Sequence, residues 1–228
     1  MCGGFGLGLE TGIDDGLLAL AGRARPRVLF VPTASGDSAD VITRFYAAFA
    51  RRSEASHVSL VRREIADLEA LCRDQDLIYV GGGNTANMLA MWRVHGFDRA
   101  LRAAYESGVV IAGVSAGAVC WFDDAVTDSF GMPMRRLGDG LGWLRGVLVP
   151  HYDREAQRRP VLARLVKDGV WSSALAIDDG AGLEYVDEQL TAVWSARDGA
   201  AAYRVERDDD GDVTEERLDV APPPTRSA

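Results

Sequence analysis

The residues best suited to chemistry in this chain are Gly113-Val114-Ser115-Ala116-Gly117. They follow an apolar run over 109–112, which predicts a strand, and precede a helix-compatible segment over 118–122. A G-x-S-x-G sequence between a strand and a helix is typical of a nucleophile elbow, because its glycines permit the sharp turn that exposes the serine hydroxyl. We therefore predict that Ser115 is a nucleophile. The alternative is a turn of small residues that serves only close packing.

A serine hydroxyl is a weak nucleophile unless a base within hydrogen-bond reach accepts its proton, and histidine is the usual base. The chain has 3 histidines. His57 begins a predicted strand and His95 ends a predicted helix, so we interpret both as structural. His151 follows the strand-like run 146–150, at the kind of strand end where open α/β sheets bind ligands. We predict that His151 is the base, the alternative being a histidine that only stiffens its loop.

The base needs a carboxylate to orient it, and the sequence offers two places. Asp178 and Asp179 follow the predicted strand 174–177, whereas Asp128 lies between the serine and the histidine. A carboxylate in a turn is more often solvated or part of an Asx turn, so the residues alone leave this choice open. No histidine follows residue 151, which disfavours the ordinary α/β-hydrolase order of serine, acid and histidine.

A second glycine-rich stretch, Gly-Gly-Gly-Asn-Thr at 81–85, directly follows the apolar run 77–80 and leads into a predicted helix. Its glycines permit close approach to the backbone, and N–H groups at a helix start can face an anion. The stretch lacks the Gly-Lys-Ser/Thr ending of a phosphate-binding P-loop. Beside a nucleophilic serine these N–H groups would form an oxyanion hole with the N–H of Ala116. A phosphate site and a plain turn are the alternatives.

Apolar runs alternate with stretches of helical spacing around these residues. Strands are predicted over 27–33, 57–61, 77–80 and 109–113, and helices over 38–52, 84–95 and 98–106. This alternation favours a parallel sheet with helices on both faces. More closely spaced strands are predicted over 146–150, 174–177, 182–186, 190–194 and 201–205. At least some of these should pair antiparallel through turns such as 186–189.

The charge balance counts against nucleic acid as a partner. The chain has 228 residues, with 25 Lys+Arg and 34 Asp+Glu, which gives a formal net charge of −9. Binding a phosphate backbone needs a basic face, and only short clusters such as Arg51-Arg52 and Arg158-Arg159 occur.

Nothing in the sequence predicts a membrane partner. The longest uncharged apolar run, 109–122, is shorter than the about 20 residues that cross a bilayer. The apolar patch 17–21 is preceded by aspartates and not by a basic segment, so no secretory leader is expected. Cysteines 2, 72 and 120 lack C-x-x-C spacing, which indicates neither a disulfide framework nor a thiolate zinc site. We therefore expect a cytoplasmic protein.

With 47% apolar residues, the chain has enough apolar side chains to bury a sizeable core. Its length fits one α/β domain, which we expect over residues 1–207. The stretch 208–228 joins the like-charge block D-D-D-G-D to a proline run, and we predict that it forms an acidic, flexible tail. The first eight residues, M-C-G-G-F-G-L-G, predict a turn-forming end, because no strand precedes them and their spacing does not match a dinucleotide-binding fingerprint.

Several short motifs occur in one order along the chain. They are V-P-T-A-S at 31–35, Y-V-G-G-G-N-T at 79–85, G-V-S-A-G-A at 113–118, P-H-Y at 150–152 and I-D-D-G at 177–180. In this ordered set the sequence resembles the S51 serine peptidases, the family of peptidase E (α-aspartyl dipeptidase) and, more distantly, of cyanophycinase. The resemblance implies a three-layer α/β/α sandwich with a mostly parallel central sheet, like class I glutamine amidotransferases, plus C-terminal antiparallel strands. Amidotransferases carry cysteine at the elbow, where this chain has Ser115, and Cys120 is the nearest cysteine.

The resemblance also implies roles for residues that match the motifs. Ser115 would be the nucleophile, His151 the base and Asp179 the orienting acid, with Asp128 as the alternative acid. The oxyanion donors would be the N–H groups of Gly82 or Gly83 and of Ala116, and the substrate-binding candidates are Asn84, Thr85, Arg154, Arg158 and Arg159. The family's substrate-side arginine lies in a segment that is shorter here, so none of the three arginines can be matched to it.

These roles predict a serine exopeptidase, a dipeptidase or aminopeptidase that hydrolyses short peptides, among them peptides with N-terminal aspartate. No metal and no organic cofactor is expected. The alternatives are a broad-specificity aminopeptidase or an esterase, and a non-catalytic protein that binds a peptide or small molecule at the elbow. The resemblance also implies a homo-oligomer, a dimer.

Overall fold

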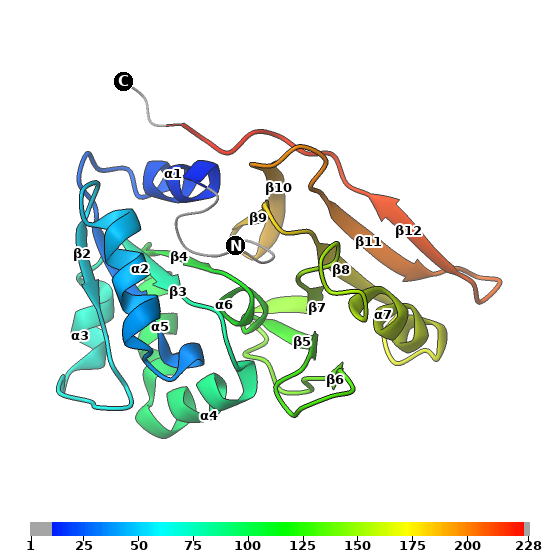
Figure 1. The fold of residues 1–228 in the computed structure, drawn as a ribbon, viewed down its shortest axis with the longest axis horizontal. Coiled ribbons are helices and arrows are strands. Elements are labelled where there is room, and N and C mark those ends of the chain that lie inside the picture. Colours follow the sequence, from blue (N-terminus) through cyan, green and yellow to red (C-terminus); the bar gives the residue numbers. More distant parts are fainter. Residues whose placement is uncertain (1–10, 226–228) are drawn as a thin grey trace.

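The computed structural model describes residues 11–225 (Figure 1). The helices are α1 (Thr11–Leu20), α2 (Ala39–Phe49), α3 (Leu68–Arg73), α4 (Thr85–His95), α5 (Phe97–Glu106), α6 (Ala116–Val119) and α7 (Arg158–Lys167), with a short 3-10 helix at Thr33–Ser35. No helix in this range is long and apolar enough to span a membrane. The turn predicted over residues 1–8 lies outside the described residues.

The first sheet is entirely parallel. Its strands are β1 (Arg27–Val31), β2 (Glu54–His57), β3 (Leu77–Val80) and β4 (Val110–Gly113), in the order β2-β1-β3-β4. Successive side chains of a strand point to opposite faces. Val28 and Phe30 pack with buried residues of α1 and α2, whereas Leu29 and Val31 pack with those of α3, α4 and α5. Helices therefore cover both faces, which produces the three layers that the sequence predicts.

The second half of the chain builds a mixed sheet of order β12-β11-β8-β7-β5-β6. Its strands are β5 (Phe122–Thr127), β6 (Arg135–Arg136), β7 (Leu144–Val149), β8 (Ser173–Ile177), β11 (Ala202–Arg207) and β12 (Val213–Arg217). The central strands β5, β7 and β8 are parallel, and β6, β11 and β12 join them antiparallel. Leu162 and Val166 of α7 pack against one face of this sheet.

A separate antiparallel hairpin joins β9 (Ala181–Val186) to β10 (Gln189–Ser195). Its turn residues Asp187 and Glu188 both have positive φ, 49° and 67°. Two consecutive positive φ values match the twist of a two-residue hairpin. The antiparallel pairing predicted through 186–189 is confirmed, and so is the α/β class with parallel and antiparallel strands.

The strand predicted over 57–61 is shifted in the structure. β2 ends at His57, where that strand was expected to begin. Val58 and Leu60 are buried in the core, at 1% exposure each, although they belong to an irregular segment. Their apolar pattern therefore reflects burial beneath the sheet edge and not strand structure.

The prediction of a flexible tail over 208–228 is wrong in part. Val213–Arg217 forms β12, which pairs along its length with β11, and Ala221 forms a β-bridge with Trp194. The acidic block makes a turn in which the Asp208 carboxylate accepts hydrogen bonds from the N–H groups of Asp210 (3.1 Å) and Asp212 (2.8 Å). Asx turns of this kind use aspartate as a turn former, so a run of like charges marks a hairpin here.

Candidate active site

Ser115 lies at the elbow between β4 and α6, with φ 53° and ψ −115°. Positive φ is uncommon for residues other than glycine and is typical of functional sites. The flanking glycines are needed because the chain is tightly packed. A Cβ on Gly113 would lie 1.9 Å from the carbonyl oxygen of Gly117, and one on Gly117 would lie 2.3 Å from that of Val80. The strand, sharp turn and helix predicted from G-x-S-x-G are therefore present.

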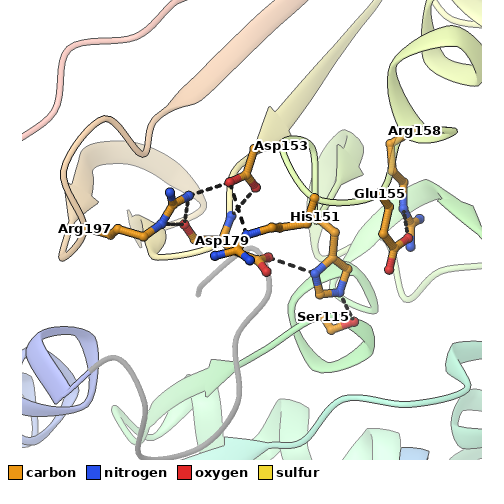
Figure 2. A network of polar contacts seen from close by, with 8 residues as sticks. Ser115, His151, Asp153, Glu155, Arg158, Asp179 and Arg197 are labelled. Atoms are coloured by element: carbon orange, nitrogen blue, oxygen red, sulfur yellow. Dashed lines mark hydrogen bonds and ion pairs between the residues drawn. The ribbon is translucent and has the colours of Figure 1, made fainter.

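A chain of two hydrogen bonds joins Ser115, His151 and Asp179 (Figure 2). His151 Nε2 lies 2.8 Å from Ser115 Oγ, and His151 Nδ1 lies 2.8 Å from Asp179 Oδ1. An ionised carboxylate only accepts hydrogen bonds, so Nδ1 carries the proton and Nε2 accepts the serine O–H. The His151 and Asp179 side chains are each 19% exposed, which leaves the group partly open to solvent.

Parallel strands explain why these residues meet. β7 and β8 pair in parallel through Leu148–Leu175 and Val149–Ala176, so their carboxyl ends lie at one edge of the sheet. His151 follows β7 and Asp179 follows β8. Like Ser115, His151 has positive φ, 55°. Two unusual backbone conformations thus occur in the same hydrogen-bonded group, as expected where surrounding packing fixes a functional geometry.

The other two carboxylates considered from the sequence are placed elsewhere. Asp178 is 3% exposed, and its Oδ2 accepts hydrogen bonds from the N–H of Ala201 (3.1 Å) and the hydroxyl of Tyr203 (3.2 Å). Burial raises the pKa of Asp178, and its Oδ1 has no hydrogen-bond partner among residues 11–225. Asp128 is exposed, and within residues 11–225 the two nitrogens of His151 are hydrogen-bonded to Asp179 and Ser115, not to Asp128.

The remaining histidines and the nearest cysteine have structural surroundings. His57 Nδ1 is hydrogen-bonded to the Tyr46 hydroxyl (2.9 Å), and His95 is the last residue of α4. The Cys120 thiol is buried beneath the elbow and contacts the carbonyl oxygen of Gly117. Burial raises its pKa well above the usual value, which keeps it in the unreactive thiol form.

The glycine loop lies directly against the elbow. A Cβ on Gly82 would lie 3.2 Å from Ser115 Cβ, and Gly83 has φ 141°, with space for a side chain blocked by Ala34. Within the described part of the chain, the N–H groups of Gly82, Gly83 and Ala116 have no hydrogen-bond acceptor. Backbone donors therefore flank the serine hydroxyl without internal partners.

Asn84 and Thr85 hold this loop in place. Asn84 Oδ1 accepts the N–H of Asn87 (2.9 Å), and its Nδ2 donates to the carbonyl oxygen of Ser129 (2.9 Å). Thr85 is buried, and its N–H donates to Ser129 Oγ (3.0 Å). Both predicted substrate-binding residues therefore contribute to capping of α4 and to its attachment to the loop after β5.

The three candidate arginines have different surroundings. Arg158 is buried and donates to Glu155 (2.8 Å) and to the carbonyl oxygen of Val126. Arg159 donates to Glu215 (2.6 Å) and stacks 4.1 Å from the ring centroid of Tyr152. Both therefore serve packing of α7. The Arg154 side chain is 63% exposed, and its one contact with a charged side chain in the described part of the protein is a 3.8 Å ion pair with Asp153.

Three residues near the site were missed by the sequence analysis. They are Ser129, which caps α4, and Asp153 and Arg197, which contact the backbone of Asp179 (Figure 2). Asp153 follows His151 by two positions in P-H-Y-D and could have been considered. Arg197 has no motif around it, because its role depends on the return of the β9–β10 hairpin to the site.

Two further features lie outside the hydrogen-bonded group. Among residues 11–225, no cluster of three or more His, Cys, Asp or Glu side chains is arranged to hold a metal ion. A cavity of about 710 Å³ opens at the start of β4, the end away from Ser115. Its walls include Val110, Trp143 and Tyr185, and none of the candidate site residues lines it.

Comparison with known proteins supports one family. The sequence model described as peptidase family S51 matches residues 6–193. The chain is 46% identical over 207 residues, 89% of each protein, to the uncharacterized peptidase YgaJ of Bacillus subtilis strain 168. A candidate peptidase E from Listeria monocytogenes EGD-e is 17% identical with a TM-score of 0.52, over 86% of this chain and 89% of that one. A peptidase from an acI-B1 actinobacterium is 20% identical with a TM-score of 0.61, over 92% and 86%.

Proposed function

Because this chain belongs to peptidase family S51 and is a serine-type peptidase, we propose that Ser115, His151 and Asp179 are its catalytic triad. The observation that carries the proposal is the pair of 2.8 Å contacts from the two nitrogens of His151 to Ser115 Oγ and Asp179 Oδ1. A nucleophile, a base and an orienting acid in this order of contact are the parts that acyl transfer requires.

In the proposed mechanism, Ser115 Oγ attacks the carbonyl carbon of the scissile peptide while His151 Nε2 accepts the hydroxyl proton. Collapse of the tetrahedral intermediate breaks the C–N bond, and His151 returns that proton to the leaving amine. Water then attacks the acyl-enzyme while His151 Nε2 accepts one of its protons. Collapse of the second tetrahedral intermediate breaks the ester C–O bond and releases the acid, and His151 returns the proton to Ser115 Oγ. Asp179 stays ionised throughout and stabilises the imidazolium that forms twice in each cycle.

The N–H groups of Ala116 and of Gly82 or Gly83 form the proposed oxyanion hole. Their lack of internal acceptors in the described chain supports this role, because a donor that is free before the reaction can bind the developing negative charge. Loss of one such donor costs about 10²–10³-fold in kcat in serine peptidases.

The proposed substrates are short peptides, cleaved from the N-terminal end. Recognition of an N-terminal aspartate would use Arg154, since Arg158 and Arg159 already make internal hydrogen bonds with glutamates. The Asp-specific form of the proposal therefore depends on one exposed arginine in the loop after His151.

The test is hydrolysis of a panel of dipeptides and tripeptides with N-terminal Asp, Glu, Ala, Leu or Met by the wild-type protein and by Ser115→Ala. We expect cleavage by the wild type and a loss of several orders of magnitude in the variant. Cleavage confined to Asp-X peptides, and weakened by Arg154→Ala, supports the aspartate preference, whereas broad cleavage removes that preference and retains the triad. Equal rates for wild type and Ser115→Ala would refute the mechanism.

A further inference from the structure

The backbone of Asp179 is held on both sides by charged side chains (Figure 2). The Asp179 N–H donates to Asp153 Oδ1 (2.9 Å). The Asp179 carbonyl oxygen accepts two hydrogen bonds from Arg197, from Nε (2.9 Å) and Nη2 (2.6 Å). Arg197 Nη2 also forms an ion pair with Asp153 Oδ2. The two side chains and one peptide segment therefore close a ring of contacts, which we term the Asp179 clamp.

The Asp179 clamp joins three separate segments. Asp153 belongs to the loop that carries His151, Asp179 to the turn after β8, and Arg197 to the segment after β10. Asp153 therefore gives the histidine loop a second attachment to the acid turn, beside the His151–Asp179 contact. Hydrogen bonds that involve a charged group are shorter and about twice as strong as neutral ones. Such contacts suit a turn whose side chain must stay in one place.

The ionisation of Asp153 is consistent with this arrangement. Partial burial alone would raise the pKa of Asp153, but the N–H of Asp179 and the guanidinium of Arg197 outweigh it, and the pKa is lowered. Asp153 is therefore an anion at neutral pH, as the ion pair with Arg197 requires. Neither clamp residue has a hydrogen bond to Ser115 or His151 within the described chain.

We propose that Asp153 and Arg197 are positioning residues, which hold the Asp179 turn where its carboxylate can orient His151. The proposal rests on the triad proposed above. The clamp residues act through the peptide group of Asp179, so their loss should impair the chemical step more than substrate binding. Displacement of a catalytic group by about 1 Å can cost on the order of 10²-fold in rate.

The kinetic test compares Arg197→Ala, Asp153→Ala and the double variant with the wild type on one peptide substrate. We expect kcat to fall about 10–10²-fold in each single variant, with little change in KM. The kcat of the double variant should be no lower than that of the less active single variant, because both residues act through the same contacts. Arg197→Lys, which restores one donor, should recover part of the loss. Arg204→Ala is the matched control, since Arg204 makes ion pairs with Glu206 and Glu216 on the far edge of the second sheet.

A spectroscopic readout separates the clamp from the peptidase activity. The proton on His151 Nδ1, hydrogen-bonded to Asp179, should give a low-field proton resonance that disappears in His151→Ala. We expect Arg197→Ala to broaden or remove this resonance while circular dichroism shows a folded protein, even if no peptide is cleaved by the wild type. A rise in KM with unchanged kcat would make Arg197 a substrate contact and overturn the proposal. An unchanged kcat and resonance in Arg197→Ala and Arg197→Lys would also overturn it.

Discussion

Asp128 and Asp179 were both candidates to orient His151, and their surroundings distinguish them. The Asp179 carboxylate contacts His151 Nδ1 at 2.8 Å, whereas Asp128 is an exposed residue of the loop after β5, where its carbonyl oxygen accepts the N–H of Gly131. A contact to Nδ1 selects the tautomer in which Nε2 can accept a proton from serine. The hydrogen bond to His151 Nδ1 therefore favours Asp179 over Asp128 as the proposed acid.

Replacing each of these aspartates in turn tests the assignment. Asp179→Asn keeps the shape of the side chain but can donate to Nδ1, which favours the wrong tautomer, so we expect kcat to fall by about 10⁴-fold. Asp128→Asn is the matched control and should retain the wild-type kcat. Steady-state kinetics on one peptide measures both effects. A large loss in Asp128→Asn with a small one in Asp179→Asn would transfer the role to Asp128.

Asp178, the neighbour of Asp179 in the sequence, should affect stability in a pH-dependent way. Burial raises its pKa in the folded protein. A raised folded-state pKa contributes stability that is fully present below the pKa of the unfolded chain and is lost as pH rises through the folded-state value. Asp178→Asn has no such proton to lose, and its oxygen can still accept from Ala201 and Tyr203.

We therefore expect the stability of Asp178→Asn relative to wild type, measured as the difference between their free energies of unfolding, to increase as pH rises from about 4 toward neutrality. Urea denaturation at a series of pH values measures this difference. A difference that stays constant across the range would show that the carboxyl of Asp178 does not titrate with folding.

The start of α4 is the element that places the glycine loop, and its capping comes from two directions. Asn84 caps the helix as its own N-cap residue. Ser129, which is distant in sequence and lies in the loop after β5, accepts with its Oγ the N–H groups of Thr85 (3.0 Å) and Ala86 (3.3 Å). Without Ser129, these two donors would lose their acceptor. The start of α4, which carries the glycine loop, would then be held less firmly against the loop after β5.

Ser129→Ala should consequently destabilise the protein by about 0.5–2 kcal/mol, the usual range for a lost helix cap, and lower kcat. Ser38→Ala is a suitable control, because Ser38 stands at the N-cap of α2 without a capping side-chain hydrogen bond. Chemical denaturation and steady-state kinetics of both variants measure the two effects. Equal stability losses in the two variants would contradict the role given to Ser129.

The sequence predicts the elements that carry the site better than it predicts those that surround it. The strand β3 lies where the apolar run 77–80 predicts it, because a strand buried on both faces has a continuous apolar pattern. α7 was missed because it opens with Arg158, Arg159 and Pro160 and buries only a few side chains, so its helical period is weak. β12 was missed because it is an exposed edge strand with polar side chains.

At the site, the same distinction applies to single residues. Ser115 and His151 could be proposed because their chemistry demands particular residue types at strand ends. Which carboxylate contacts His151 could not be derived from the residues alone, since it depends on how β8 pairs beside β7. Arg197 reaches the site only after the chain has returned through the β9–β10 hairpin, and no local pattern records that path.

On the scale of the whole molecule, β12 completes the second sheet and should be required for its stability. It pairs with β11, and its Glu215 accepts hydrogen bonds from Tyr152 (2.6 Å) and Arg159 (2.6 Å). A chain truncated after Arg207 would lose these contacts and expose the edge of β11 to association. The histidine loop would lose the support of Tyr152 as well.

We expect truncation after Arg207 to cost more than about 1 kcal/mol, or more than about 2–4 °C in Tm, and to increase light scattering at elevated concentration. Truncation after Thr225 is the control and should leave both measurements unchanged. Calorimetry and static light scattering give the two readouts. A Tm equal to that of the full chain would show that β12 is dispensable.

The proposed nucleophile and its partners come from different sheets: Ser115 follows β4 of the first, while His151 and Asp179 follow β7 and β8 of the second. In the proposed mechanism, proton transfer across the 2.8 Å Ser115–His151 contact therefore depends on the alignment of the two sheets. A displacement of one sheet relative to the other would separate Ser115 from His151 and abolish peptidase activity while every strand remained paired. Mild denaturant should accordingly abolish activity reversibly before any change in secondary structure, so that inactivation and unfolding are two separate transitions.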